Sequence, residues 1–106
     1  MAKYMLHVNY NLDGIRGVAA KGGSAREKAA RDAVESLGGT IDSFYFAFGD
    51  IDVVVIADFP DPVSAAALAI AVGAGGGASV RTTVLLTAKD VDKAAKKQVA
   101  YRPPGS

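Results

Sequence analysis

The stretch that decides the fold is Thr40 to Phe59, which reads TIDSFYFAFGDIDVVVIADF. Aromatic and β-branched residues, which favour strands, lie on both sides of the turn-forming pair Gly49-Asp50. The pattern predicts a hairpin with strands at 40–48 and 51–59. Apolar residues occupy both parities of these strands, whereas a sheet with one solvated face carries polar residues at alternate positions. Both faces of the predicted sheet must therefore be buried against other parts of the protein or against a partner.

One strand and one helix are predicted upstream of the hairpin. Residues 3–10 alternate in character, as a strand requires. One face would hold Tyr4, Leu6, Val8 and Tyr10, and the other Met5, His7 and Asn9. The glycine-rich segment 11–23 predicts a turn or a single loose helical turn. A helix is expected from Ser24, which forms a capping box with Glu27, to Gly38-Gly39.

A helix, a strand and a final helix are predicted downstream. The first helix covers 62–74, because Asp61 is a good N-cap and Pro62 suits the first helical position. A strand over 78–86 and a helix over 88–99 follow. The first six elements of the chain thus have the order of the ferredoxin-like βαββαβ fold, an α+β fold with two helices on one face of a four-stranded antiparallel sheet.

A chain of 106 residues fits a single domain, which we place at 1–98 with a C-terminal tail at 99–106. Two helices cover only one face of the sheet. We expect the other face to pack against the sheet of a second copy, which predicts a homodimer or a higher oligomer. The helix at 88–99, folded across that face, is the alternative cover.

Composition excludes several classes of function. Lys and Arg number 12 against 11 Asp and Glu, so no charge imbalance points to nucleic acid or to a membrane, and neither is an expected partner. The absence of cysteine excludes disulfides, thiolate nucleophiles and cysteine-bound metals. No secretory signal precedes the first strand, and the longest apolar run is shorter than the ~20 residues that span a bilayer. A cytoplasmic location is expected.

His7, the single histidine, is the first candidate site residue. It would face the space between two sheets, as a general base, a ligand contact or an interface histidine. A lone imidazole makes a poor metal site, and no metal or cofactor is predicted. Asn9 shares this face. By parity, Tyr45 and Arg81 join His7, where a phenol and a guanidinium suit a carboxylate or phenolic ligand; a core position is the alternative for Tyr45.

Two further candidates come from turns. Arg26 lies just after Gly22-Gly23-Ser24, which either binds an anion at a helix start or forms only a turn. Asp52 begins a strand rich in valine, where a carboxylate needs a hydrogen-bond or charge partner. Together with Asp50 it could act as a general acid and base, and the alternative is that both residues only stabilise the turn. The predicted ligand-binding residues are His7, Asn9, Arg26, Tyr45, Asp52 and Arg81. No catalytic residue is assigned.

Three segments carry a resemblance to a known family. They are Gly22 to Arg26 (GGSAR), Phe44 to Asp52 (FYFAFGDID) and Thr82 to Thr87 (TTVLLT). From Tyr4 to about Lys97, the chain resembles the bacterial GYD-domain family. The resemblance implies a dimeric α/β barrel, in which two ferredoxin-like sheets face each other, and an uncharacterised function. Ile51 stands where such proteins usually carry a tyrosine, so any role of that hydroxyl is absent.

Two functions remain open. The first is a non-enzymatic small-ligand-binding or assembly module that holds a small organic molecule between two sheets. The second, by analogy with other dimeric α/β barrels, is a cofactor-independent enzyme of the monooxygenase or isomerase type that uses the same space. An enzyme requires several ionisable side chains at the cavity, and the sequence offers few, which favours the binding module.

Overall fold

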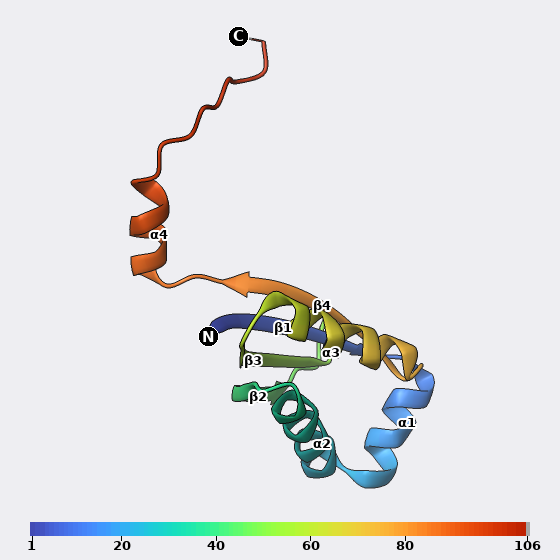
Figure 1. Cartoon of the computed structure of the whole chain (residues 1–106). Helices are drawn as coiled ribbons and strands as arrows, with labels where there is room; N and C mark the ends of the chain where they lie inside the picture. Colours follow the sequence, from blue (N-terminus) through green and yellow to red (C-terminus); the bar gives the residue numbers. More distant parts are fainter. Residues whose placement is uncertain (106) are drawn as a thin grey trace.

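The computed structural model describes residues 1–105, which form one four-stranded sheet and four helices (Figure 1). The strands are β1 (Ala2–Tyr10), β2 (Thr40–Phe46), β3 (Val53–Phe59) and β4 (Ala78–Leu85). The helices are α1 (Leu12–Lys21), α2 (Gly23–Ser36), α3 (Pro62–Ala74) and α4 (Ala88–Ala95). The predicted α+β class is confirmed. The arrangement is consistent with a ferredoxin-like fold, with α1 as an additional helix.

The sheet has the strand order β2-β3-β1-β4, and all neighbouring strands are antiparallel. Leu6 in the centre of β1 lies opposite Val55 of β3 and Thr82 of β4. A bulge between Ile41 and Ser43 shifts the register of β2. Residues of β1 and β3 alternate between the two faces, so the parity predicted for residues 3–10 is confirmed.

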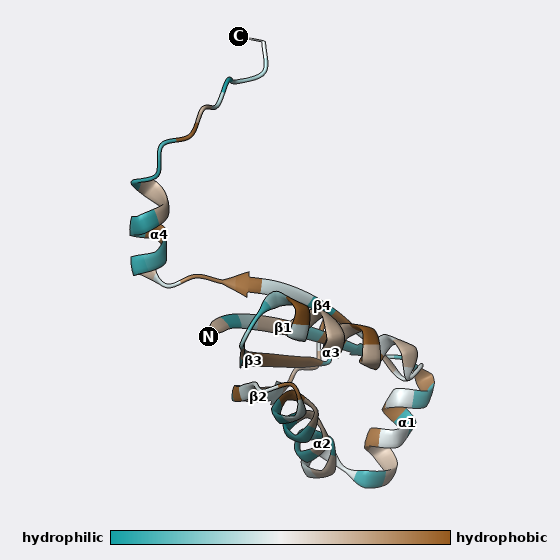
Figure 2. Cartoon of the chain, viewed as in Figure 1, coloured by the Kyte–Doolittle hydropathy of each residue, from teal (hydrophilic) through white to brown (hydrophobic). Residues whose placement is uncertain are grey.

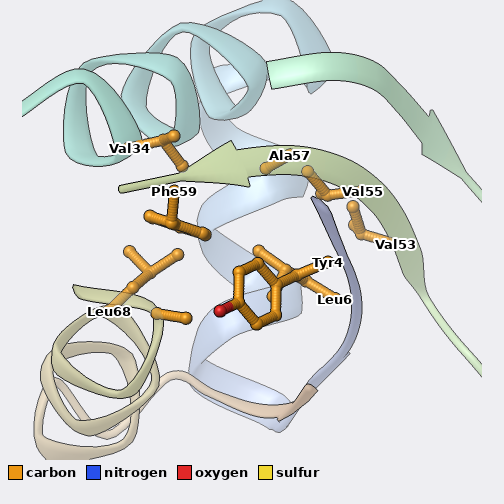
Figure 3. Packing of buried hydrophobic residues seen from close by; sticks show 9 residues of the cluster. Tyr4, Leu6, Val34, Val53, Val55, Ala57, Phe59 and Leu68 are labelled. Atoms are coloured by element: carbon orange, nitrogen blue, oxygen red, sulfur yellow. The ribbon is translucent and has the colours of Figure 1, made fainter. Parts of the chain in front are cut away.

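The core lies between one face of the sheet and helices α2 and α3. Its buried residues are Tyr4, Leu6, Val34, Val53, Val55, Ala57, Phe59, Ala65 and Leu68 (Figure 3). The rings of Tyr4 and Phe59 meet edge to face, with their centroids 5.8 Å apart. Burying a side chain such as Phe59 stabilises the fold by about 1.5–3 kcal/mol. Two helices thus cover one face, as expected.

Helix α1 is longer than expected, because segment 11–23 was predicted to form a turn or a single loose helical turn and α1 has 10 residues. The side chain of Asn11 caps α1 by accepting a hydrogen bond from the Gly14 N–H at 3.0 Å. The Asn11 backbone N–H also donates to the Gly77 carbonyl at 3.0 Å. Gly14 packs so closely on this loop that a Cβ there would overlap the Gly77 carbonyl oxygen. These tertiary contacts offset the low helix propensity of glycine.

The predicted capping box at the start of the next helix is wrong. Helix α2 begins one residue before Ser24, and its N-cap, Gly22, makes no side-chain hydrogen bond. Gly22 alone connects α1 to α2 and has φ of +87°, a conformation that glycine adopts most readily. Glu27 pairs instead with Arg31 one turn later, at 2.9 Å. The sharp connection between the two helices therefore fixes where α2 begins.

The predicted start of α3 is confirmed, because Asp61 accepts a hydrogen bond from the Ser64 N–H at 2.7 Å. Helix α4 ends at Ala95, earlier than predicted. It has no buried residue and extends away from the sheet (Figure 1), so it does not cover the second face. The predicted tail at 99–106 contains no helix or strand through residue 105, and Ser106 lies outside the described residues.

Candidate functional site

A row of four side chains crosses the open face of the sheet, the face away from α2 and α3. His7 of β1 pairs with Val54 of β3 on one side and with Arg81 of β4 on the other. Val54 in turn pairs with Tyr45 of β2. The predicted sharing of one face by His7, Tyr45 and Arg81 is confirmed.

The open face is apolar in its centre and polar at its edges. Met5 and Ile56 lie opposite each other next to the row, and both are half-buried. Figure 2 shows that β3 is hydrophobic along most of its length. Tyr45 is 70% exposed on the edge strand, so its alternative placement in the core is wrong. Arg81 is exposed on the opposite edge strand.

Asn9 and Asp52, two of the predicted ligand-binding residues, fasten the loop before β3 to the end of β1. The Asn9 amide donates to the backbone carbonyl of Asp50 at 3.2 Å, and its buried Oδ1 has no hydrogen-bond partner. The Asp52 carboxylate accepts a hydrogen bond from the Tyr10 N–H at 2.7 Å. The expectation that Asp52 needs a partner is confirmed, and the partner is backbone.

A cavity of about 770 Å³ lies on the other side of the sheet, between the sheet and the helices. Its floor includes Leu6, Val8, Phe44, Val53, Val55 and Val80. Its helical walls consist mainly of small residues, among them Ala25, Ala29, Ala30, Ala33, Ala71 and Gly75. Because such side chains extend only a short way, α2 and α3 leave space above the floor. This volume lies within the range of roughly 300–1,000 Å³ found for small-molecule sites.

Polar residues gather at one end of the cavity, where α1 forms the wall. Tyr10, Asp13, Lys21 and Arg26 all line it. Burial raises the pKa of the Tyr10 phenol, while the positive charge of Arg26 acts in the opposite direction. Within residues 1–105, Arg26 forms no ion pair with a carboxylate. This end of the cavity therefore combines the Tyr10 phenol with a guanidinium that forms no ion pair within residues 1–105.

The structure divides the predicted ligand-binding residues between two sides of the sheet. Arg26 lies at the cavity, whereas His7, Tyr45 and Arg81 form the row on the open face. Sequence reasoning missed Tyr10 as a site residue, because it was placed in the core face without regard to its hydroxyl. The alanines of α2 at spacings of three and four residues were a signal, but they indicate a helix face of small residues and not a cavity.

Over residues 1–105, no three or more His, Asp or Glu side chains come together in a way that could hold a metal ion. In the same part of the chain, none of the helices has the length and apolar character needed to cross a membrane.

Comparison with known proteins gives one family. The GYD domain profile matches residues 4–95, from early in β1 to the end of α4. No curated protein and no solved structure matches the chain. The match includes the hairpin and the Gly22 to Arg26 segment at the polar end of the cavity. Since it covers most of the 106 residues, the chain belongs to the GYD domain family.

Proposed function

We propose that the protein is a small-ligand-binding module that acts as a homodimer and holds its ligand between the sheet and helices α2 and α3. The cavity of about 770 Å³ carries this proposal, because it combines an apolar floor with a few polar groups at one end. The proposed ligand position therefore lies on the helix side of the sheet. It replaces the space between two sheets, which the sequence suggested.

The open face supports the homodimer. Val54 and Ile56 of the central strand β3 lie on this face, and α4 leaves it uncovered. Exposed apolar area costs about 25 cal/mol per Å², and two sheets packed face to face about 10 Å apart would remove it from water. In such a dimer, Tyr45 and Arg81 at the sheet edges are available to contact the partner.

The two parts of the proposal are sterically compatible. The row through His7 and the cavity lie on opposite sides of the same sheet. Dimerisation through the open face would therefore leave both cavities accessible, and one ligand would bind to each chain. Binding and assembly are separately testable for the same reason.

Native mass spectrometry of the purified protein tests the proposal. We expect a dimer that carries a bound small molecule, or an empty dimer that binds the uncharged fluorophore N-phenyl-1-naphthylamine. Ala30→Leu places a larger side chain in the cavity lining and should weaken binding by about tenfold or more, because the leucine takes space that the ligand would occupy. Ala66→Leu is the matched control, because Ala66 is exposed on α3 away from the cavity lining.

Two outcomes contradict the proposal. If the wild-type protein neither carries a ligand nor binds the fluorophore, the cavity is not a binding site. If Ala30→Leu and Ala66→Leu bind equally well, the ligand lies elsewhere on the protein. The fold of both variants is checked by circular dichroism, so that a loss of binding is not confused with unfolding.

A further inference from the structure

We infer that the cavity selects an apolar molecule with a single acidic group, which is bound by Arg26 and the Tyr10 hydroxyl while the apolar body lies along α2. This inference rests on the proposed function and adds the chemical class of the ligand. It concerns the cavity below the helices and does not depend on the dimer.

The cavity is polar at one end and apolar at the other. Arg26 lies in the first turn of α2 and Tyr10 at the end of β1. Val34 lines the cavity eight residues after Arg26, which corresponds to about 12 Å at a helical rise of about 1.5 Å per residue. Val34 and Leu68 are buried at this apolar end. A ligand with one polar end therefore has one favourable orientation.

The charge at the polar end favours an anion. Among the residues that line the cavity, Arg26 and Lys21 supply two positive charges and Asp13 one negative charge; the Asp52 carboxylate lies outside the lining and is engaged by the Tyr10 N–H. Neither cation forms an ion pair within residues 1–105. A guanidinium binds an oxyanion through parallel N–H donors, which makes Arg26 the stronger recognition group of the two. The apolar floor, by contrast, offers no partners for further polar groups on the ligand.

Tyr10 is held in place before any ligand binds. Its backbone N–H donates to the Asp52 carboxylate at 2.7 Å. Its ring lies against α1, so close that a Cβ on Gly14 would come within 3.0 Å of the ring atom Cδ1. The Tyr10 phenol, whose pKa burial raises above its usual value of 10.0, is protonated at neutral pH and can donate a hydrogen bond to an acid. Because this donor is already fixed beside a guanidinium, little conformational entropy is lost when a ligand binds.

A pair of matched fluorophores tests the inference. The anion 1-anilinonaphthalene-8-sulfonate and the uncharged N-phenyl-1-naphthylamine share the same aromatic body and differ in the sulfonate. Each is titrated into the wild-type protein and into the variants Arg26→Gln, Tyr10→Phe, Arg16→Gln and Ala30→Leu. Arg16 is the matched control for lost charge, because it is exposed on α1 and does not line the cavity.

The wild-type protein should bind the anion about tenfold more tightly than the uncharged probe, as expected for a charge-assisted contact. Arg26→Gln should remove most of this preference, and Tyr10→Phe should weaken anion binding several-fold. Both should weaken binding of the uncharged probe less than binding of the anion. Arg16→Gln should change neither probe. Ala30→Leu should weaken binding of both, which locates them in the cavity.

The outcomes separate the inference from the proposed function. If Ala30→Leu weakens both probes but the anion has no advantage, or Arg26→Gln does not reduce it, the cavity binds ligands without selecting acids and the inference is overturned. If Ala30→Leu affects neither probe, the cavity is not the binding site, and the proposed function fails together with the inference.

Discussion

The carboxylate of Asp52 accepts a hydrogen bond from the backbone N–H of Tyr10 at 2.7 Å. The Asp52 N–H also donates to the Val8 carbonyl at 3.0 Å, and its carbonyl accepts from the Ala47 N–H at 2.9 Å. Asp52 thus joins the loop before β3 to the end of β1. It thereby determines where Tyr10 enters the polar end of the cavity.

Asp52→Ala should lower the free energy of unfolding by about 1.5–3 kcal/mol, the usual loss for a hydrogen bond to a charged group. Asp50→Ala is the control, because the Asn9 amide contacts only the backbone carbonyl of Asp50. We expect the control to stay within about 0.5 kcal/mol of the wild type, as exposed substitutions usually do. Urea denaturation measures both, and equal losses would show that the Asp52 carboxylate contributes nothing specific.

Two glycines of α1 should respond to alanine in opposite ways. A Cβ at Gly14 would overlap the Gly77 carbonyl, so Gly14→Ala should destabilise the protein by about 1–3 kcal/mol, as overpacking does. Apart from its chain neighbours and the backbone of α1 itself, no atom lies within 4 Å of the Cβ position at Gly17. Gly17→Ala should therefore stabilise the protein by about 0.5–1 kcal/mol. Thermal unfolding measures both, and a stable Gly14→Ala variant would argue against the tight contact between α1 and the loop before β4.

The proposed homodimer predicts that a charge in the centre of the open face disrupts assembly. Val54→Lys should raise the dissociation constant of the dimer by at least about tenfold, because it brings two like charges together at a buried interface. Val63→Lys is the matched control, since Val63 is 76% exposed on α3. Sedimentation velocity at micromolar concentration measures both. A monomeric wild-type protein, or a Val54→Lys dimer of unchanged affinity, would refute the proposed interface.

The N-cap of α3 should contribute to the pH dependence of stability. The Ser64 N–H lowers the pKa of Asp61 below its value of about 3.9 in an unfolded chain. The stability from the charged cap is therefore complete above about pH 4 and is lost as the pH falls through the lower pKa of the folded state. Asp61→Asn retains the cap but does not titrate.

Melting temperatures measured between pH 6 and pH 2.5 should consequently fall more steeply for the wild type than for Asp61→Asn, by linkage. The pKa values of Asp42 and Asp90 are also lowered, by Lys3 and by Thr87 respectively, and both carboxylates are present in both proteins. Their contribution cancels in the comparison. Identical slopes for the two proteins would contradict a titrating cap at Asp61.

The placement of side chains on the two sheet faces was predictable from the sequence. In a strand, successive side chains point to opposite faces, so the burial of Tyr4 and Leu6 places His7 on the other side. The same argument placed Tyr45 and Arg81, although the bulge in β2 lies close to Tyr45. Had the bulge fallen after Tyr45, the argument would have failed for that residue.

Helix α1 and the cavity were not predictable, for different reasons. The contacts that stabilise α1 join Asn11 and Gly14 to the loop at Gly77, which is far away in the sequence. Local propensity, weakened by glycines, carries no information about them. The cavity depends on how far apart α2 and α3 lie above the sheet. Alanines such as Ala29 and Ala30 are equally compatible with closely packed helices and with an open space.

The C-terminal arm, formed by α4 and the described residues after it up to 105, has a practical consequence. The arm extends away from the sheet and contributes to the longest dimension of the chain, 56 Å (Figure 1). An affinity tag, a surface anchor or a fluorescent reporter attached through the arm would stand clear of both the cavity and the open face. Immobilised protein should therefore remain free to capture ligand and to recruit a second copy from solution.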